Sequence, residues 1–173
     1  MFSSKSSSLI ALLASSTKEG KKVRVFKPSN DTRYKEDAIV SHDGLHFPAV
    51  NLDVKNLYHQ ALDYLNDLTD LVVFDEAQFF EAEPMVKLIK HLLSSKIEVV
   101  CAGLSQDSFG EPFGAMPVLM ALADEVISLK ATCAKCFTPK SATRTFRKTK
   151  VTEQVVVGGV DIYEPRCFTC WKF

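Results

Sequence analysis

Two adjacent carboxylates, Asp75 and Glu76, directly follow the short apolar run 71–74. This run of leucine, two valines and phenylalanine is typical of a strand buried on both faces of a parallel sheet. Ligands of open α/β sheets bind beyond the carboxyl ends of the strands, so the two acids would lie where chemistry is usually done. One acid could hold Mg²⁺ beside a nucleotide phosphate while the other accepts a proton from an attacking hydroxyl. A strand that simply ends in two solvated acids is the plainer alternative.

Lys5 and Ser6 form a second candidate site near the amino end. They open a helical pattern with four apolar residues predicted to be buried: Leu9, Ile10, Leu12 and Leu13. In a phosphate-binding loop, backbone N–H groups at a helix N-terminus cradle the phosphates, a lysine adds positive charge and a hydroxyl ligates Mg²⁺. The match is incomplete, because Ser4 stands where the pattern has glycine. A serine-rich targeting segment without acidic residues is an equally good interpretation of the first 18 residues.

Four of the five cysteines form two C-x-x-C pairs, Cys133 with Cys136 and Cys167 with Cys170. Four thiolates at this spacing fit one tetrahedral Zn²⁺ and leave no open coordination position, so the predicted metal site is structural. Disulfides or free thiols are the alternative, but the sequence shows no export signal. Between the pairs, residues 143–157 are predicted to form a β-hairpin, followed by a glycine turn at 158–159. Zinc would stabilise this small flap.

The segments that must position these groups alternate between strand and helix. Apolar runs predict strands at 23–26, 71–74, 99–104 and 126–129. Amphipathic stripes predict helices around 54–65, 84–92 and 116–123. Such alternation gives βαβ crossovers and therefore a parallel sheet. The loop 103–114 would then lie at the carboxyl edge of the sheet, as a candidate nucleotide-handling loop.

Length and composition agree with one domain plus an appendage. The chain has 173 residues, and 46% hydrophobic content is enough for a core. Lys+Arg and Asp+Glu each count 21, a balance that argues against a general nucleic-acid or membrane-surface binder. No apolar run approaches the ~18 residues needed to span a membrane. A zinc-ribbon nucleic-acid binder is a minor alternative, since the basic residues near the cysteines are diluted by acids.

Together these motifs resemble the thymidine kinase family of the cytosolic and bacterial, zinc-containing type. The resemblance extends from Met1 almost to Phe173. It is carried by Met1-Phe2-Ser3 with Lys5-Ser6, Phe26-Lys27-Pro28, Asp31-Thr32-Arg33-Tyr34, Ser41-His42-Asp43-Gly44, Asp75-Glu76-Ala77-Gln78-Phe79-Phe80, Ala102-Gly103-Leu104, Gly110-Glu111-Pro112-Phe113-Gly114, the two cysteine pairs, and Val157-Gly158-Gly159 through Tyr163.

The resemblance implies an α/β fold: a parallel-sheet P-loop NTPase-like core at 1–130 and a small C-terminal zinc-binding lasso domain at 131–173. It implies ATP-dependent phosphorylation of the 5′-hydroxyl of thymidine or deoxyuridine in nucleotide salvage, with ATP, Mg²⁺ and a structural Zn²⁺. A cytoplasmic homotetramer inhibited by thymidine triphosphate, with no nucleic-acid or membrane partner, is also expected from the family.

The resemblance further implies a role for each matching residue. Glu76 would be the general base, and Asp75 would hold Mg²⁺ through water. The other residues expected around ATP and the metal are Ser3, Ser4, Lys5, Ser6, Asp43 and Gln78. Those expected around the nucleoside are Met1, Phe79, Leu104, Phe113, Thr145, Val156, Gly158 and Tyr163. The four paired cysteines would bind zinc.

The sequence departs from the family pattern in three places. A Cβ at Ser4 would crowd the phosphates and oppose the backbone dihedrals that the loop requires. The family's first strand, expected beside the 71–74 strand, is missing, which would leave unpaired backbone groups in the core unless the true start lies upstream. The stretch 104–108 lacks an acid and an aromatic residue of the pattern. These departures favour one alternative: a catalytically impaired or truncated paralogue that binds nucleoside or assembles without turnover.

Overall fold

The computed structural model describes residues 2–29, 38–40, 44–66, 68–149, 153–156 and 158–171. Among the predicted site residues, Met1 and Asp43 lie outside this part of the chain. The motif 31–34 and most of the motif 41–44 also lie outside it, so the structure places the remaining candidate residues only.

The central sheet is parallel, as predicted. It has four strands, of which the one at 50–52 was not predicted. They are β1 (Val23–Pro28), β4 (Val50–Leu52), β5 (Leu71–Phe74) and β6 (Glu98–Cys101), in the order β4-β1-β5-β6. All four residues of β5 are buried. Because side chains alternate along a strand, Leu71 and Val73 pack on one face while Val72 and Phe74 pack on the other.

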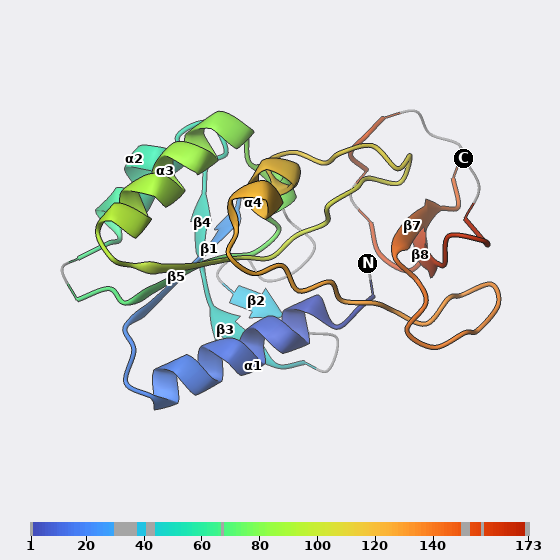
Figure 1. The fold of residues 1–173 in the computed structure, drawn as a ribbon, viewed down its shortest axis with the longest axis horizontal. Helices are drawn as coiled ribbons and strands as arrows, with labels where there is room; N and C mark the ends of the chain where they lie inside the picture. Colours follow the sequence, from blue (N-terminus) through green and yellow to red (C-terminus); the bar gives the residue numbers. More distant parts are fainter. Residues whose placement is uncertain are drawn as a thin grey trace.

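Helices cover both faces of this sheet (Figure 1). On one face lies α1 (Lys5–Lys18), together with the two-stranded sheet of β2 (Ala38–Val40) and β3 (His46–Pro48). On the other lie α2 (Leu57–Asp63), α3 (Ala82–Ser94) and α4 (Met116–Leu122). Among the described helices, none is long and apolar enough to cross a membrane.

The predicted helical stripes are mostly correct. In α3, Met85, Leu88, Ile89 and Leu92 are buried as expected. In α1, the buried face consists of Leu9, Ile10, Leu13 and Ser16, so the prediction that Leu12 is buried is wrong. At about 100° per residue, Leu12 lies only about 60° from Leu9 around the helix, nearer than the buried Ile10, so helical periodicity alone does not separate the two. Ile10 packs in the apolar cluster on this face of the sheet while Leu12 is exposed, so the neighbouring elements cover one edge of the helix and leave the other in solvent.

Two predictions about the sheet are wrong. Residues 126–129 form no strand; their segment has no regular secondary structure and is exposed. Strands persist when a neighbour satisfies their backbone groups, and within the described residues β6 is paired only with β5. The expected gap beside β5 is also absent, because β5 pairs with β1 on one side and with β6 on the other.

The cysteine-bearing part of the chain contains an antiparallel hairpin of β7 (Arg144–Arg147) and β8 (Tyr163–Arg166). The predicted hairpin within 143–157 is therefore wrong, since the second strand lies further along the chain. In the observed hairpin of β7 and β8, Arg144 pairs with Arg166. This register brings Cys167, the residue after β8, beside the first cysteine pair. We call residues 131–171 the cysteine hairpin below. It lies on the side of the sheet where α1 begins (Figure 1).

Candidate functional site

Three charged side chains that lie far apart in the sequence meet where β5 ends and α1 begins. The ammonium of Lys5 hydrogen-bonds to Oδ1 of Asp75 and lies 2.9 Å from Oε1 of Glu76. Burial works to lower the pKa of Lys5, but the Glu76 and Asp75 carboxylates together raise it above its ordinary value. Burial raises the pKa of Asp75, although the Lys5 charge opposes that shift. The structure thus brings three predicted site residues into one partly buried ion cluster.

Strained backbone flanks this cluster on both sides. Ser4 has φ 60° and ψ 26°, and Glu76 has φ 50°, both in the left-handed region that favours glycine. For a residue with a Cβ this conformation costs roughly 1–2 kcal/mol. Ser4 therefore adopts the conformation for which the family pattern has glycine. The Glu76 N–H donates to Oδ1 of Asp75 at 2.9 Å, which fixes the two acids relative to one another.

The N-terminus of α1 has the features of an anion site. Ser4 precedes the helix without capping it through its side chain, and the first turn contains no acidic residue. The first N–H groups of a helix have no intrahelical acceptor and lie at the positive end of its dipole, so they suit a phosphate. Ser3 and Ser6 are half-buried in this turn and loop, on either side of Lys5 in the chain.

Gln78 joins the acidic pair to the 103–114 loop. It lies in the 3₁₀ turn η1 (Ala77–Phe79) and is almost fully buried. Its Nε2 donates to Oε2 of Glu76, and its Oε1 accepts the N–H of Leu104 at 3.0 Å. Gly114, at φ +51°, packs so closely that an added Cβ would lie 1.8 Å from the Gln78 carbonyl oxygen. Gln78 is therefore held between the acids and both ends of the loop.

Two of the predicted apolar wall residues are in contact. The rings of Phe79 and Phe113 meet edge to face, with centroids 5.6 Å apart. Phe113 is buried, and Phe79 and Leu104 are half-buried. Aromatic edges and faces of this kind can bind a planar base.

The four remaining nucleoside-side candidates belong to the cysteine hairpin. The Tyr163 hydroxyl donates to the Val156 carbonyl at 2.8 Å. Thr145 is buried, and its carbonyl accepts the indole N–H of Trp171 at 3.0 Å. Gly158 packs on Ile162, whose Cδ1 would lie 2.4 Å from an added Cβ.

The hairpin is linked to the core by residues that sequence reasoning did not assign to the site. Gln154 donates to Oδ2 of Asp107 at 2.8 Å, and the Arg147 guanidinium lies 5.1 Å from the centre of the Phe109 ring. Asp107 is followed by Ser-Phe-Gly, a pattern in which an aspartate accepts the N–H two residues on. That signal could have identified Asp107 as the organiser of its loop. The partner Gln154 carries no such signal.

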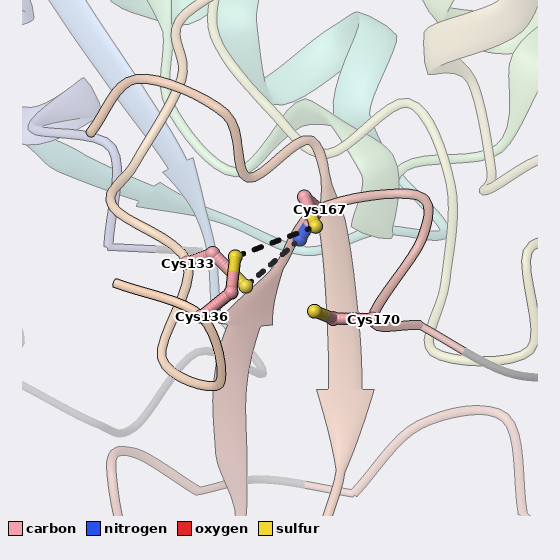
Figure 2. A group of neighbouring side chains, drawn as sticks. All are labelled: Cys133, Cys136, Cys167 and Cys170. Atoms are coloured by element: carbon pink, nitrogen blue, oxygen red, sulfur yellow. Dashed lines mark hydrogen bonds between the residues drawn. The ribbon is translucent and has the colours of Figure 1, made fainter. Parts of the chain in front are cut away.

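The four paired cysteines converge on one point (Figure 2). Their Sγ atoms all lie within 4.8 Å of one another, and the sulfurs of Cys136 and Cys167 are 3.8 Å apart. None of the four is in a disulfide. Sulfur ligands of a tetrahedral zinc ion are about 3.8 Å apart, given a Zn–S bond of about 2.3 Å. The cluster therefore fits a single zinc ion.

Backbone donors prepare the cluster for a cation. The Cys167 N–H donates to the sulfur of Cys133 at 3.3 Å. Burial works to raise the pKa of the Cys133 thiol, but the N–H groups of Cys136, Cys167 and Lys135 lower it to about 6. A thiolate is the form that binds zinc.

Comparison with known proteins agrees with this geometry. The family model described as thymidine kinase matches residues 1–171. A thymidine kinase from Coprothermobacter proteolyticus is 40% identical over 172 residues, which cover 96% of this chain and 84% of that protein. The match includes both the ion cluster and the cysteine hairpin. The chain therefore belongs to the thymidine kinase family.

Proposed function

We propose that this protein transfers the γ-phosphoryl group of ATP to the 5′-hydroxyl of thymidine. The new bond joins the 5′ oxygen to the γ-phosphorus, the bond to the β–γ bridging oxygen breaks, and ADP leaves with thymidine monophosphate as the other product. The observation that carries the proposal is the convergence of Lys5, Asp75 and Glu76 at the N-terminus of α1, in a chain of this family.

The phosphate side of the site supplies positioning and charge. The first-turn N–H groups of α1 and the Lys5 ammonium would hold the phosphates, aided by Ser3 and Ser4. Asp75 and the Ser6 hydroxyl are hard oxygen donors suited to Mg²⁺. Bound Mg²⁺ would neutralise charge on the phosphates, and Gln78 and Asp43 would support this side of the site.

Glu76 is the proposed general base, taking the proton of the 5′-hydroxyl as that oxygen bonds to phosphorus. Its carboxylate is oriented by the Gln78 amide, and its other oxygen is in contact with Lys5.

The proposed nucleoside side of the site consists of core and hairpin residues that would enclose the base. Phe79, Leu104 and Phe113 would form the apolar wall contributed by the core. The residues that would close over thymine are Met1, Thr145, Val156, Gly158 and Tyr163. Deoxyuridine, which lacks only the ring methyl group, would be the second substrate.

The remaining parts of the proposal concern assembly. A structural Zn²⁺ at Cys133, Cys136, Cys167 and Cys170 would stabilise residues 131–173 as a lasso domain beside a 1–130 kinase core. A cytoplasmic homotetramer, inhibited by thymidine triphosphate and without nucleic-acid or membrane partners, follows the family pattern.

A second candidate is a paralogue that binds thymidine without turnover. Ser4 favours it, because a residue with a Cβ holds this left-handed conformation only at a cost in strain, and its side chain would crowd phosphates bound beside Lys5.

Transfer of label from γ-labelled ATP to thymidine, by folded and zinc-loaded protein, tests both candidates. Thymidine-dependent formation of labelled monophosphate is expected. Calorimetric binding of thymidine without transfer would support the second candidate, and the absence of both would refute the two together. Omission of Mg²⁺ should abolish transfer and leave thymidine binding intact.

A further inference from the structure

Asp107 divides its two carboxylate oxygens between the core and the cysteine hairpin. Oδ1 accepts the N–H groups of Phe109 at 2.8 Å and Glu111 at 3.0 Å. Oδ2 accepts the side-chain amide of Gln154 at 2.8 Å. Asp107 is 4% exposed and Gln154 is exposed, so these are part-buried, charge-assisted hydrogen bonds. One oxygen therefore hydrogen-bonds within the loop, and the other binds Gln154, which lies 47 residues further along the chain.

The loop that carries Asp107 is a preformed platform. The Asp107 N–H donates to the Glu111 carbonyl at 3.0 Å, and Phe113 donates to Ser105 at 3.2 Å. Gln106 and Pro112 form an antiparallel bridge across the same turn. These bonds close the loop without help from the hairpin, so the hairpin docks onto a fixed partner.

Arg147 also holds the segment around Gln154, through the backbone of that segment. Its two terminal nitrogens donate to consecutive backbone carbonyls, that of Glu153 at 2.6 Å and that of Gln154 at 2.9 Å. Its guanidinium lies 5.1 Å from the Phe109 ring and 5.4 Å from the Tyr163 ring. Arg147 is thus packed between the 103–114 loop and the hairpin while it binds the segment between β7 and β8.

We call the contacts of Asp107 and Arg147 with residues 153–154 the clamp. Residues 153–156 have no regular secondary structure, so side-chain contacts decide where they lie. Gln154 is held by its side chain and its carbonyl, and Val156 is held two residues on by the Tyr163 hydroxyl. Three of these anchors come from outside the segment, one from the core and two from the hairpin strands. The clamp therefore fixes the distance between the core and the part of the hairpin that includes Val156.

We propose that Asp107 and Arg147 are positioning residues that set the hairpin against the core and thereby determine thymidine affinity. The inference rests on the proposed function, because Leu104 and Phe113 share the loop of Asp107 while Val156 and Tyr163 share the clamp of Arg147. Loosening the clamp should widen the nucleoside side of the site. The ATP side, anchored by α1 and β5, should be unaffected.

An exchange of amide and carboxylate tests the link between Asp107 and Gln154. Asp107→Asn keeps an oxygen for the loop N–H groups but removes the carboxylate charge. The Gln154 amide can then pair with the new asparagine only by turning its oxygen toward it, and the charge-assisted hydrogen bond is lost. Gln154→Glu instead brings two carboxylates together. The double variant Asp107→Asn with Gln154→Glu restores one donor and one acceptor in reversed order. Glu111→Gln, an exposed loop residue without a side-chain role in the clamp, is the charge-matched control.

Each single clamp variant should raise the KM for thymidine about tenfold, since a part-buried hydrogen bond to a charged group is lost. The KM for ATP and kcat should change less than about threefold, because no phosphate contact is altered. The double variant should return the KM for thymidine to within about threefold of the wild-type value. A role in folding alone would lower the melting temperature without this selective recovery. Equal KM values in all variants, or no recovery in the double variant, would overturn the proposal.

Hydrogen–deuterium exchange of the peptide covering 148–162, in protein without substrates, separates the clamp from the catalytic assignment. Exchange should accelerate in both single variants and return toward wild-type rates in the double variant. If it does so while the wild-type protein fails to phosphorylate thymidine, the clamp stands as a structural link and the proposed function falls. If exchange is unchanged in all clamp variants and turnover is normal, the proposed clamp is refuted while the proposed function stands.

Discussion

The two sides of the candidate site are held by different forces. The acids follow β5, whose four residues are buried between apolar layers contributed by α1 on one face and by α2, α3 and α4 on the other. The cysteine hairpin has a much smaller apolar cluster of Ala131, Cys133 and Ala142, with Cys167 and Cys170 against it. Packing therefore positions the phosphate side and the apolar wall that the core contributes, whereas thiolates and side-chain hydrogen bonds position the residues that the cysteine hairpin contributes. Changes to one side should leave the other largely intact.

The largest expected effect comes from removing the proposed base. Glu76→Gln should lower kcat by about 10²–10⁴-fold, because an amide cannot accept the hydroxyl proton. Thymidine affinity should stay nearly the same, since the amide oxygen of a glutamine at position 76 can still accept the Gln78 hydrogen bond that links this turn to the loop. Turnover by labelled-ATP transfer and binding by calorimetry measure the two quantities. Glu81→Gln, at an exposed glutamate before α3, is the control and should behave as wild type. Normal turnover in Glu76→Gln would refute the base assignment.

The second largest effect is expected from loss of the metal, which should disorder the cysteine hairpin and leave the core folded. Cys136→Ser removes one of four thiolates, and structural zinc in isolated finger peptides contributes roughly 10–16 kcal/mol, so the hairpin should lose its order. Zinc content should fall, and amides of 131–171 should exchange rapidly while those of β5 stay protected. Thymidine affinity should fall by more than about tenfold, because the clamp of 153–156 is lost with the hairpin.

Cys101→Ala is the matched control for that variant. Cys101 lies half-buried in β6, outside the cysteine cluster, and its replacement should leave zinc content unchanged. Slow exchange throughout the hairpin of zinc-free Cys136→Ser would contradict the division drawn above. It would show that hydrogen bonds alone suffice to order that region.

The smallest expected effect is on stability and ATP affinity, from a substitution at Ser4 on the phosphate side. Ser4→Gly should raise the free energy of unfolding by about 1 kcal/mol, because glycine adopts the left-handed conformation without strain. ATP affinity should rise as well, measured by calorimetry beside thermal unfolding. Ser8→Gly, the same chemical change at an exposed helical position of α1, should instead destabilise by about 0.5–1 kcal/mol. A loss of stability in Ser4→Gly would mean that the Ser4 side chain makes a favourable contact that outweighs its strain.

The sequence predicted best where one local pattern determines the structure. The run 71–74 could only be satisfied by burial on both faces, and four cysteines in two close pairs have few arrangements other than one cluster. The family resemblance implied that Lys5 and the two acids lie around the same phosphates, and the structure brings the three side chains into contact. The catalytic roles of these residues stay predictions.

The sequence predicted least where the local structure depends on a partner that is distant in the chain. The apolar residues at 126–129 match a strand pattern, but a strand also needs a neighbour with free backbone groups, and no local pattern supplies that information. The partner of β7 was misplaced for the same reason: β7 pairs with β8, and the Glu153 and Gln154 carbonyls accept hydrogen bonds from the Arg147 side chain. The bond between Asp107 and Gln154 joins two residues without any shared motif.

The alternation of side chains along β5 has one more consequence. The period of two that sends Leu71 and Val73 to one layer and Val72 and Phe74 to the other also fixes the direction in which the chain leaves the strand at Asp75. Inserting or deleting a single residue in β5 would exchange the two layers and rotate the acids away from Lys5 by half a turn. Evolution can therefore vary the identity of these four apolar residues far more readily than their number.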